Sequence, residues 1–371
     1  MSAPIIEHYR KLAVSREGSR YELSVHPFAL DDEPQAKLQA VRDIRSLMAT
    51  EKHFFKHHSY RWAARLDSYR NGFEGLLQLF ILVAISDISP EHPHYELLSN
   101  ICARAAAMGG ANAHSFQSGE FRYALVSTGL LKLLWEFLHT FDELAPRPAR
   151  YEEKPGTNIS ASCWIDGDAE QIAENSPLAL DRLIQLAAAY VDFRLPTPLG
   201  PRYSNRTQLQ GARGLYIARM IAAADAFIVL HEVGHLLRHK SSNAPRTLTE
   251  EIEADEVALS LMIILASKIP SIGEMFLGGI SLAFAAMRYA NLVGKIVRIR
   301  RYKDAAIQDE EKFENELYQR SRLLSTNAIM MGLPAGIATT FDRQSQEFFL
   351  LTEATKIHLL KRLKRGRGLP S

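Results

Sequence analysis

The spacing of apolar residues along the chain predicts a mostly helical protein. Apolar positions recur every three or four residues over residues 31–50, 61–85, 97–108 and 130–144, and this period is typical of helices that bury one face. We therefore predict a helical N-terminal region over residues 1–145.

The middle of the chain is more varied. Residues 146–156 are the best candidate for a linker, because Pro and charged residues dominate them. Residues 158–165, with the sequence NISASCWI, form the best candidate strand. A helix is predicted to begin at Pro177 and to end near Val191, since Pro is favoured at the first helical position. Residues 194–214 are rich in Pro and Gly and predict a long loop that leads into the next helix.

The longest helical pattern covers residues 212–240 and is apolar on nearly every side. It contains no Pro and only two Gly. A helix that is apolar all round is a buried one. Glu and His near its C-terminal end are therefore expected in a low-dielectric environment, where such side chains are tolerated when they are paired or bound to a metal.

This helix carries the pentad His231-Glu232-Val233-Gly234-His235. Residues four apart share one face of a helix, so both imidazoles point to the same place. Two neutral imidazoles at this spacing form half of a tetrahedral zinc site. Glu232 lies close enough to take a proton from a zinc-bound water. The pentad therefore predicts a catalytic zinc site.

A second helix is expected shortly after the first. Residues 241–245 end the first helix, and Thr247-Leu248-Thr249-Glu250 has the pattern of a capping box that opens the second. A short helical hairpin of this kind can turn the start of the second helix toward the two histidines.

Acidic residues crowd the first turns of this second helix. Glu251 and Asp255 are four residues apart and share one face of it. We expect Glu251 as the third zinc ligand and Asp255 as the acceptor of a histidine N–H, an arrangement that leaves the fourth zinc position open for water. Glu250 is the alternative ligand, whereas Glu253 points to another side.

The pentad followed by Glu-x-x-Ala-Asp on the next helix resembles the gluzincin metallopeptidases, above all the pattern shared by the Ste24/HtpX-type and ImmA/IrrE-type enzymes. The resemblance covers this pair of helices alone. It implies that His231, His235 and Glu251 bind zinc, that Glu232 is the general base and that Asp255 supports a ligand. A weaker similarity, to Lit-like phage-exclusion peptidases, covers only the pentad.

The resemblance implies a mostly α (α+β) fold, in which a zincin-like catalytic helix pair is joined to a small β-sheet. We predict three parts: the helical N-terminal region over residues 1–145, a zincin-like metallopeptidase domain over residues 157–345 and a basic C-terminal helix or tail over residues 346–371. The expected function is hydrolysis of a peptide bond in an intracellular protein or peptide substrate. The expected cofactor is one Zn²⁺ ion per chain.

A di-iron carboxylate oxidase is an alternative function. Glu136 and His139 form a Glu-x-x-His pair, and Glu232 and His235 form another. Two such pairs on separate helices are what di-iron bundles use, together with single Glu ligands from two further helices. This alternative leaves His231 without a role.

A regulatory module with a structural zinc is the other alternative. A structural site is closed by a fourth protein ligand, and His239 or Glu250 could fill that position. A hydrolytic site needs instead a further donor to stabilise the oxyanion. Besides His239, the candidates for such a donor are Arg288, Tyr289 and Tyr302.

Composition favours a soluble enzyme of the cytoplasm. The 47% of hydrophobic residues support a sizeable core, and the net charge of +2 indicates no nucleic-acid partner. Cys102 and Cys163 lack the spacing of a disulfide framework or a thiolate metal site, and the N-terminal sequence has no apolar targeting segment. The longest uncharged runs, residues 76–86 and 275–287, are shorter than the roughly 18 apolar residues of a membrane-spanning helix. We therefore predict two buried core helices there and no transmembrane segment.

Overall fold

The structure is a computed structural model, and only part of the chain is described by it. The described residues are 72–85, 88, 91–92, 97–98, 101–106, 113–118, 121–144, 167–191, 211–239, 246–269, 273, 275–302, 308–333 and 335–365. The predicted helix over residues 31–50, the linker over 146–156 and the strand over 158–165 lie outside these residues. Of the predicted loop over 194–214, only the last residues are described, and they are helical.

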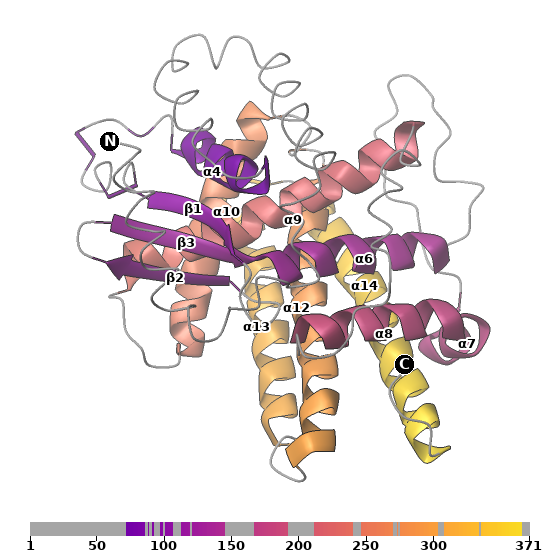
Figure 1. Cartoon of the computed structure of the whole chain (residues 1–371). Helices are drawn as coiled ribbons and strands as arrows, with labels where there is room; N and C mark the ends of the chain where they lie inside the picture. The colour runs from indigo at the N-terminus through magenta and orange to yellow at the C-terminus, as the bar shows by residue number, and fades with distance from the viewer. Residues whose placement is uncertain are drawn as a thin grey trace. The chain divides into compact units, whose positions relative to one another are not determined.

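Within the described residues the chain is mostly helical and contains a small three-stranded sheet (Figure 1). The helices are α4 (Gly72–Ala84), α6 (Thr128–Leu144), α7 (Ala169–Asn175), α8 (Pro177–Val191), α9 (Gly211–Arg238), α10 (Leu248–Lys268), α12 (Phe276–Tyr302), α13 (Gln308–Met330) and α14 (Ala335–Lys364). The strands are β1 (Ile101–Ala106), β2 (Ala113–Ser118) and β3 (Phe121–Ser127). The predicted mostly α fold with a small sheet is confirmed.

The chain divides into two compact units that are not consecutive in the sequence. Unit 1 consists of residues 1–108, 113–128 and 228–270, and unit 2 contains the remainder. The division passes through α9, whose last turns belong to unit 1. Helix α14 is continuous through the predicted boundary between residues 345 and 346.

The sheet of unit 1 has the strand order β1-β3-β2. Strand β1 pairs with β3 in parallel and β2 pairs with β3 in antiparallel orientation. Ala124 of the central strand is aligned with Ala103 on one side and with Ser115 on the other. Strand β2 is therefore an edge strand, and Ser115 lies at its middle.

The outer side of β1 is bonded to helix α4. The Ala103 N–H donates to Gln78 Oε1 at 2.8 Å, and Gln78 Nε2 donates to the Ile101 carbonyl at 3.3 Å. Buried backbone groups of an edge strand need such partners. A single buried glutamine therefore ties α4 to the sheet.

The sheet corrects two predictions for the N-terminal region. Over residues 97–108 we predicted a helix, but among the residues described there only 97–98 are helical and β1 occupies 101–106. Ile101 and Ala103, two residues apart, are both buried, and pairing with β3 overrides the helical spacing of this Ala-rich segment. Residues 1–145 are therefore not all helical, because they contain all three described strands.

Four predicted helices are confirmed where they can be compared. Helix α6 matches residues 130–144, and α8 begins at Pro177 as expected. Helix α9 ends two residues before the predicted limit of 240. Helix α10 begins after Thr247, whose side chain and that of Glu250 form both hydrogen bonds of the capping box. These elements are defined by local spacing and caps, which the sequence contains directly.

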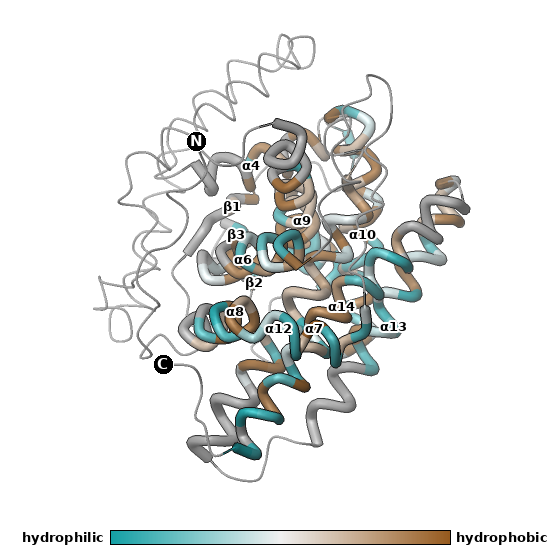
Figure 2. The backbone as a smooth tube through the Cα atoms, turned by 90° about the vertical axis from the view of Figure 1, so that its right-hand side faces the viewer, coloured by the Kyte–Doolittle hydropathy of each residue, from teal (hydrophilic) through white to brown (hydrophobic). Residues whose placement is uncertain are grey.

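Unit 2 is a helical assembly with an aromatic core. The Phe137 ring packs edge-to-face against Tyr289 and Phe348, with ring centroids 5.5 and 6.2 Å apart. Asp181 of α8 accepts from His358 Nε2 and Arg362 Nη1 of α14, both at 2.6 Å. Figure 2 shows apolar and polar stretches alternating along the helices of this unit, as expected for helices that bury one face.

Two helical segments are long and apolar enough to cross a membrane by length and composition, Arg219–Arg238 and Phe276–Gly294. In both, 83% of the window is buried inside the protein, as is usual for core helices of globular proteins. The predicted burial of residues 76–86 and 275–287 is confirmed for the side chains that the structure describes.

Candidate metal site

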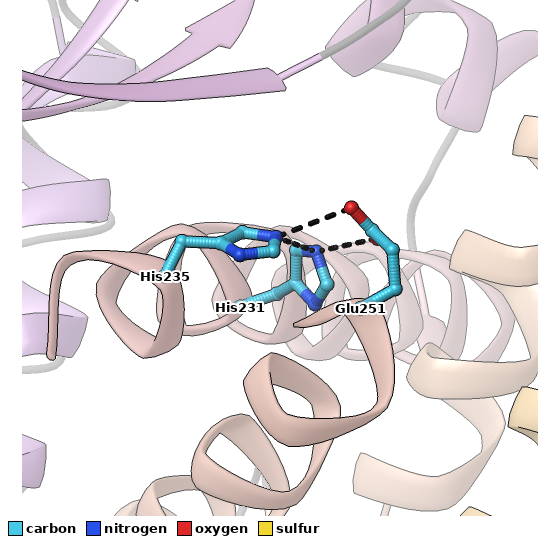
Figure 3. A group of neighbouring side chains, drawn as sticks. All are labelled: His231, His235 and Glu251. Atoms are coloured by element: carbon cyan, nitrogen blue, oxygen red, sulfur yellow. Dashed lines mark hydrogen bonds and ion pairs between the residues drawn. The ribbon is translucent and has the colours of Figure 1, made fainter. Parts of the chain in front are cut away.

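Three side chains from α9 and α10 meet at one point in unit 1 (Figure 3). The Nε2 atoms of His231 and His235 are 3.0 Å apart. Glu251 places Oε2 at 3.3 Å from His231 Nε2 and Oε1 at 3.4 Å from His235 Nε2. The three side chains are 12%, 2% and 24% exposed. This largely buried group can hold a metal ion.

A close helix crossing brings the three residues together. A Cβ on Gly234 would lie 2.6 Å from the Ala254 carbonyl oxygen, closer than any side chain permits. Gly234 therefore lets α9 contact the backbone of α10. The capping box at Thr247 fixes where α10 begins, and so determines which of its residues face α9. Glu251, in the first turn, faces the histidines.

Asp255 orients one of the histidines. Its Oδ1 lies 2.8 Å from His231 Nδ1, and Asp255 is only 2% exposed. A carboxylate at this distance keeps the proton on Nδ1, so that Nε2 presents its lone pair to the group. Hydrogen bonding of this kind is what a metal-binding histidine requires. The structure therefore places Asp255 behind His231, where the sequence analysis expected it.

The spacing of the group suits a tetrahedral ion. Ligand atoms at about 2.0–2.2 Å from a tetrahedral zinc ion lie roughly 3.3–3.6 Å from one another. The three separations here are 3.0, 3.3 and 3.4 Å. Two imidazoles and one carboxylate are also a donor set that zinc accepts. The residues present therefore fit zinc, with three protein ligands.

Glu232 lies beside the group without belonging to it. It is 4% exposed, and its Oε2 has no hydrogen-bond partner. Burial raises the pKa of Glu232, whereas His231, Arg246 and a hydrogen bond from Ser115 partly oppose this increase. The result is a buried carboxyl group that is a stronger base than an exposed one and has one oxygen still available.

Ser115 and Arg246 were missed by the sequence analysis. Arg246 Nη2 donates to Ser115 Oγ at 2.7 Å and lies 3.8 Å from Glu232 Oε2. The two residues are 131 positions apart in the sequence. Nothing in local spacing predicts that β2 approaches the start of α10, so no sequence signal could have found this pair.

The other acids and His239 have different partners. Glu250 Oε2 accepts from the Thr247 N–H at 2.8 Å, and these interactions lower the pKa of Glu250. Its carboxylate therefore caps α10 and is not the third ligand. Glu253 is 47% exposed, with Oε2 3.7 Å from His239 Nε2. His239 Nε2 lies 3.1 Å from the Glu250 carbonyl oxygen, and His239 does not join the ligand group.

The remaining candidates lie in unit 2. Among the described residues, the single group of three or more possible ligands is the one above, so Glu136 and His139 belong to no such group. His139 stacks on Trp135 with ring centroids 5.7 Å apart. Arg288 bonds Glu353 at 2.7 Å, and Tyr289 is fully buried. The side chain of Tyr302 lies outside the described residues.

Comparison of this chain with protein-family models, curated proteins and solved structures gives no significant match. Function is therefore inferred from the geometry of the site.

Proposed function

We propose that this chain is a zinc-dependent metallopeptidase that hydrolyses a peptide bond in a protein or peptide substrate. The observation that supports the proposal most is the place of Glu232. It is a buried carboxylate, adjacent in sequence to one histidine of the ligand group, and one of its oxygens lacks a hydrogen-bond partner. A buried polar atom without a partner is costly, and a reaction that uses it is a common reason for its presence.

A zincin-like arrangement is part of the proposal. Helix α9 carries the His-Glu-x-x-His pentad and α10 carries the acidic ligand, as in the gluzincins that the sequence resembles. Zinc held by His231, His235 and Glu251 would supply Lewis-acid chemistry, which polarises a carbonyl group and makes water nucleophilic at neutral pH. The absence of a fourth protein ligand from the described group favours a catalytic site over a structural one.

The carboxylate of Glu232 has two tasks in this mechanism. It accepts a proton from the attacking water and later donates that proton to the leaving amine. Because burial raises the pKa of Glu232, the carboxylate can hold the proton between the two steps. Asp255 meanwhile keeps His231 in the tautomer that leaves Nε2 free for the ion. The small number of Cys residues, two in 371, fits a reducing compartment, and we propose the cytoplasm as the location.

The substitution Glu232→Gln tests this function. Gln keeps nearly the same volume and hydrogen-bonding reach, and removes only the proton acceptor. The variant should bind zinc at the wild-type stoichiometry, unfold at a similar temperature and lose hydrolysis. The measurement is the appearance of new protein N-termini in a native cell lysate incubated with the zinc-loaded chain. Glu253→Gln is the matched control, since Glu253 is half exposed, and should cleave like the wild type.

Two results would overturn the proposal. One is a Glu232→Gln variant that produces the same new N-termini as the wild type. The other is a zinc-loaded wild-type chain that produces none in lysate from its own cells.

A further inference from the structure

Glu232 of α9 takes part in a hydrogen-bond network with Ser115 of β2 and with Arg246, which lies just before α10. Ser115 Oγ accepts a hydrogen bond from Arg246 Nη2 at 2.7 Å. Ser115 also hydrogen-bonds to the Glu232 carboxylate. Arg246 Nη2 is 3.8 Å from Glu232 Oε2, which is too long for a hydrogen bond. Arg246 therefore acts on Glu232 in two ways, as a direct ion pair at 3.8 Å and through its hydrogen bond to the serine.

The chemistry of the three groups determines which of them donates and which accepts each hydrogen bond. A guanidinium group only donates, and a carboxylate only accepts. A hydroxyl group has one proton and two lone pairs. Since the Ser115 oxygen accepts from Arg246, its proton is directed to Glu232. Oε2 of Glu232 has no hydrogen-bond partner and lies at ion-pair distance from Arg246.

Each member of the network is itself fixed by its surroundings. Ser115 is at the middle of β2, aligned with Ala124 of the central strand. Arg246 directly precedes Thr247, whose N–H is bound by Glu250 in the capping box. Glu232 lies on the buried part of α9. The three anchors are a strand, a helix cap and a helix, so the carboxylate has little freedom to rotate.

We propose that Ser115 and Arg246 are positioning residues that hold the Glu232 carboxylate in the orientation that the reaction needs. The inference depends on the proposed function for its chemical meaning, but it concerns only the orientation of one carboxylate. Its competitor is a purely structural role, in which the Arg246–Ser115 bond joins β2 to α10 and Glu232 is indifferent to it.

A small zinc-binding probe separates the two roles without requiring the natural substrate. Acetohydroxamate chelates zinc through its two oxygens, and its hydroxyl group hydrogen-bonds to a carboxylate placed beside the ion. We would measure its affinity for the zinc-loaded full-length chain by calorimetry. Ser115→Ala and Arg246→Met should each weaken binding by about 10-fold. Zinc stoichiometry and unfolding temperature should stay at wild-type values.

Non-additivity is the signature of action through Glu232. The double variant Ser115→Ala/Arg246→Met should lose less affinity than the product of the two single fold-losses, because Arg246 acts in part through the serine. In a Glu232→Ala background neither substitution should change the affinity. Ser115→Thr, which keeps the hydroxyl group, should restore it. Matched controls are Ser260→Ala and Arg322→Met, which remove an exposed serine and an exposed arginine elsewhere.

The outcomes distinguish this inference from the proposed function. Wild-type affinity in both single variants, or losses that persist in the Glu232→Ala background, would show a structural role only and overturn the inference. Such a result could coexist with a peptidase that depends on Glu232. Conversely, a chain that shows the predicted probe affinities but cleaves no protein would support the positioning role of Ser115 and Arg246 and overturn the proposed peptidase function. A chain that binds no zinc would overturn both.

Discussion

Helix α9 carries two buried acids, Asp225 and Glu232, and their surroundings differ. The two lie seven residues apart, close to two turns, and so occupy nearly the same face of the helix. They are 2% and 4% exposed, and burial raises the pKa of each. By sequence position and burial alone, the two acids are almost equivalent.

The difference lies in what surrounds each carboxyl group. Burial is the only cause of the pKa increase at Asp225, and its Oδ1 has no hydrogen-bond partner. Around Glu232 the increase is opposed by His231, Arg246 and Ser115. Burial alone disfavours the charged form of an acid. The neighbouring His231, Arg246 and Ser115 each favour the charged form of Glu232 and so oppose the effect of burial on its pKa.

The largest expected effect comes from exchanging each acid for its amide. Glu232→Gln should reduce hydrolysis by about 10²–10⁴-fold, the usual contribution of a positioned general base. Asp225→Asn should leave the rate within about twofold of the wild type. Both rates would be measured on the same cleaved protein or peptide. A comparable loss in Asp225→Asn would mean that the two halves of α9 share one function.

Of the two buried acids Asp255 and Asp225, only Asp255 should contribute to zinc binding, because it hydrogen-bonds to His231. Asp255→Ala removes the acceptor of the His231 Nδ1–H and should weaken zinc binding by about 10–100-fold. Asp225→Ala removes an equally buried acid and should leave zinc affinity unchanged. Competition with a chromogenic chelator measures both affinities. Equal losses would indicate that general damage to α9, and not the hydrogen bond, weakens the site.

Two close helix contacts should separate packing from metal binding. Cβ atoms on Gly234 and on Gly279 would lie 2.6 and 2.5 Å from the nearest atoms of Ala254 and Ala223. Gly234→Ala and Gly279→Ala should each lower the free energy of unfolding by about 1–3 kcal/mol, measured in urea. Only Gly234→Ala should also weaken zinc binding, because it moves α10 away from the histidines. Unchanged zinc affinity in that variant would contradict this account of the crossing.

The smallest expected effect is a pH dependence that belongs to Asp225. Below about pH 4 the carboxyl is protonated in both the folded and the unfolded chain. Above that pH the unfolded chain loses the proton while the folded chain keeps it, so stability falls as pH rises toward the raised pKa of Asp225. The slope is at most about 1.4 kcal/mol per pH unit.

The free energy of unfolding of Asp225→Asn should therefore fall less between about pH 5 and pH 7 than that of the wild type. The measurement uses the metal-free chain, because zinc binding has its own pH dependence. Identical slopes in the two proteins would show that Asp225 is ionised in the folded state.

The ligand group could be predicted from sequence because its geometry is local. His231 and His235 share a face through helix periodicity, and the capping box sets the phase of α10, so that Glu251 and Asp255 face them. The same cap explains why Glu250 is excluded, since its carboxylate is already bonded to Thr247. The spacing within α9 and α10 and the cap between them were sufficient to predict this group.

The surroundings of Glu232 could not be predicted, because they depend on pairing between distant segments. Ser115 comes to the site on β2, and the helical spacing of residues 97–108 concealed the strand β1 of the same sheet. Strand pairing is decided by partners far along the chain, which a single sequence does not specify. The three candidate ligands can therefore be predicted from local patterns, whereas the groups around Glu232 cannot.

Metal content tests the central claim most directly. We would express the full-length chain, remove loosely bound ions by gel filtration and measure zinc and iron by plasma mass spectrometry. The wild type should carry one zinc per chain, as should Glu136→Ala/His139→Ala. Glu251→Ala should lose the zinc, whereas Glu253→Ala should retain it. Two irons per chain that disappear in the Glu136→Ala/His139→Ala variant, or zinc that persists in Glu251→Ala, would contradict the assignment of His231, His235 and Glu251 as the ligands of a zinc peptidase.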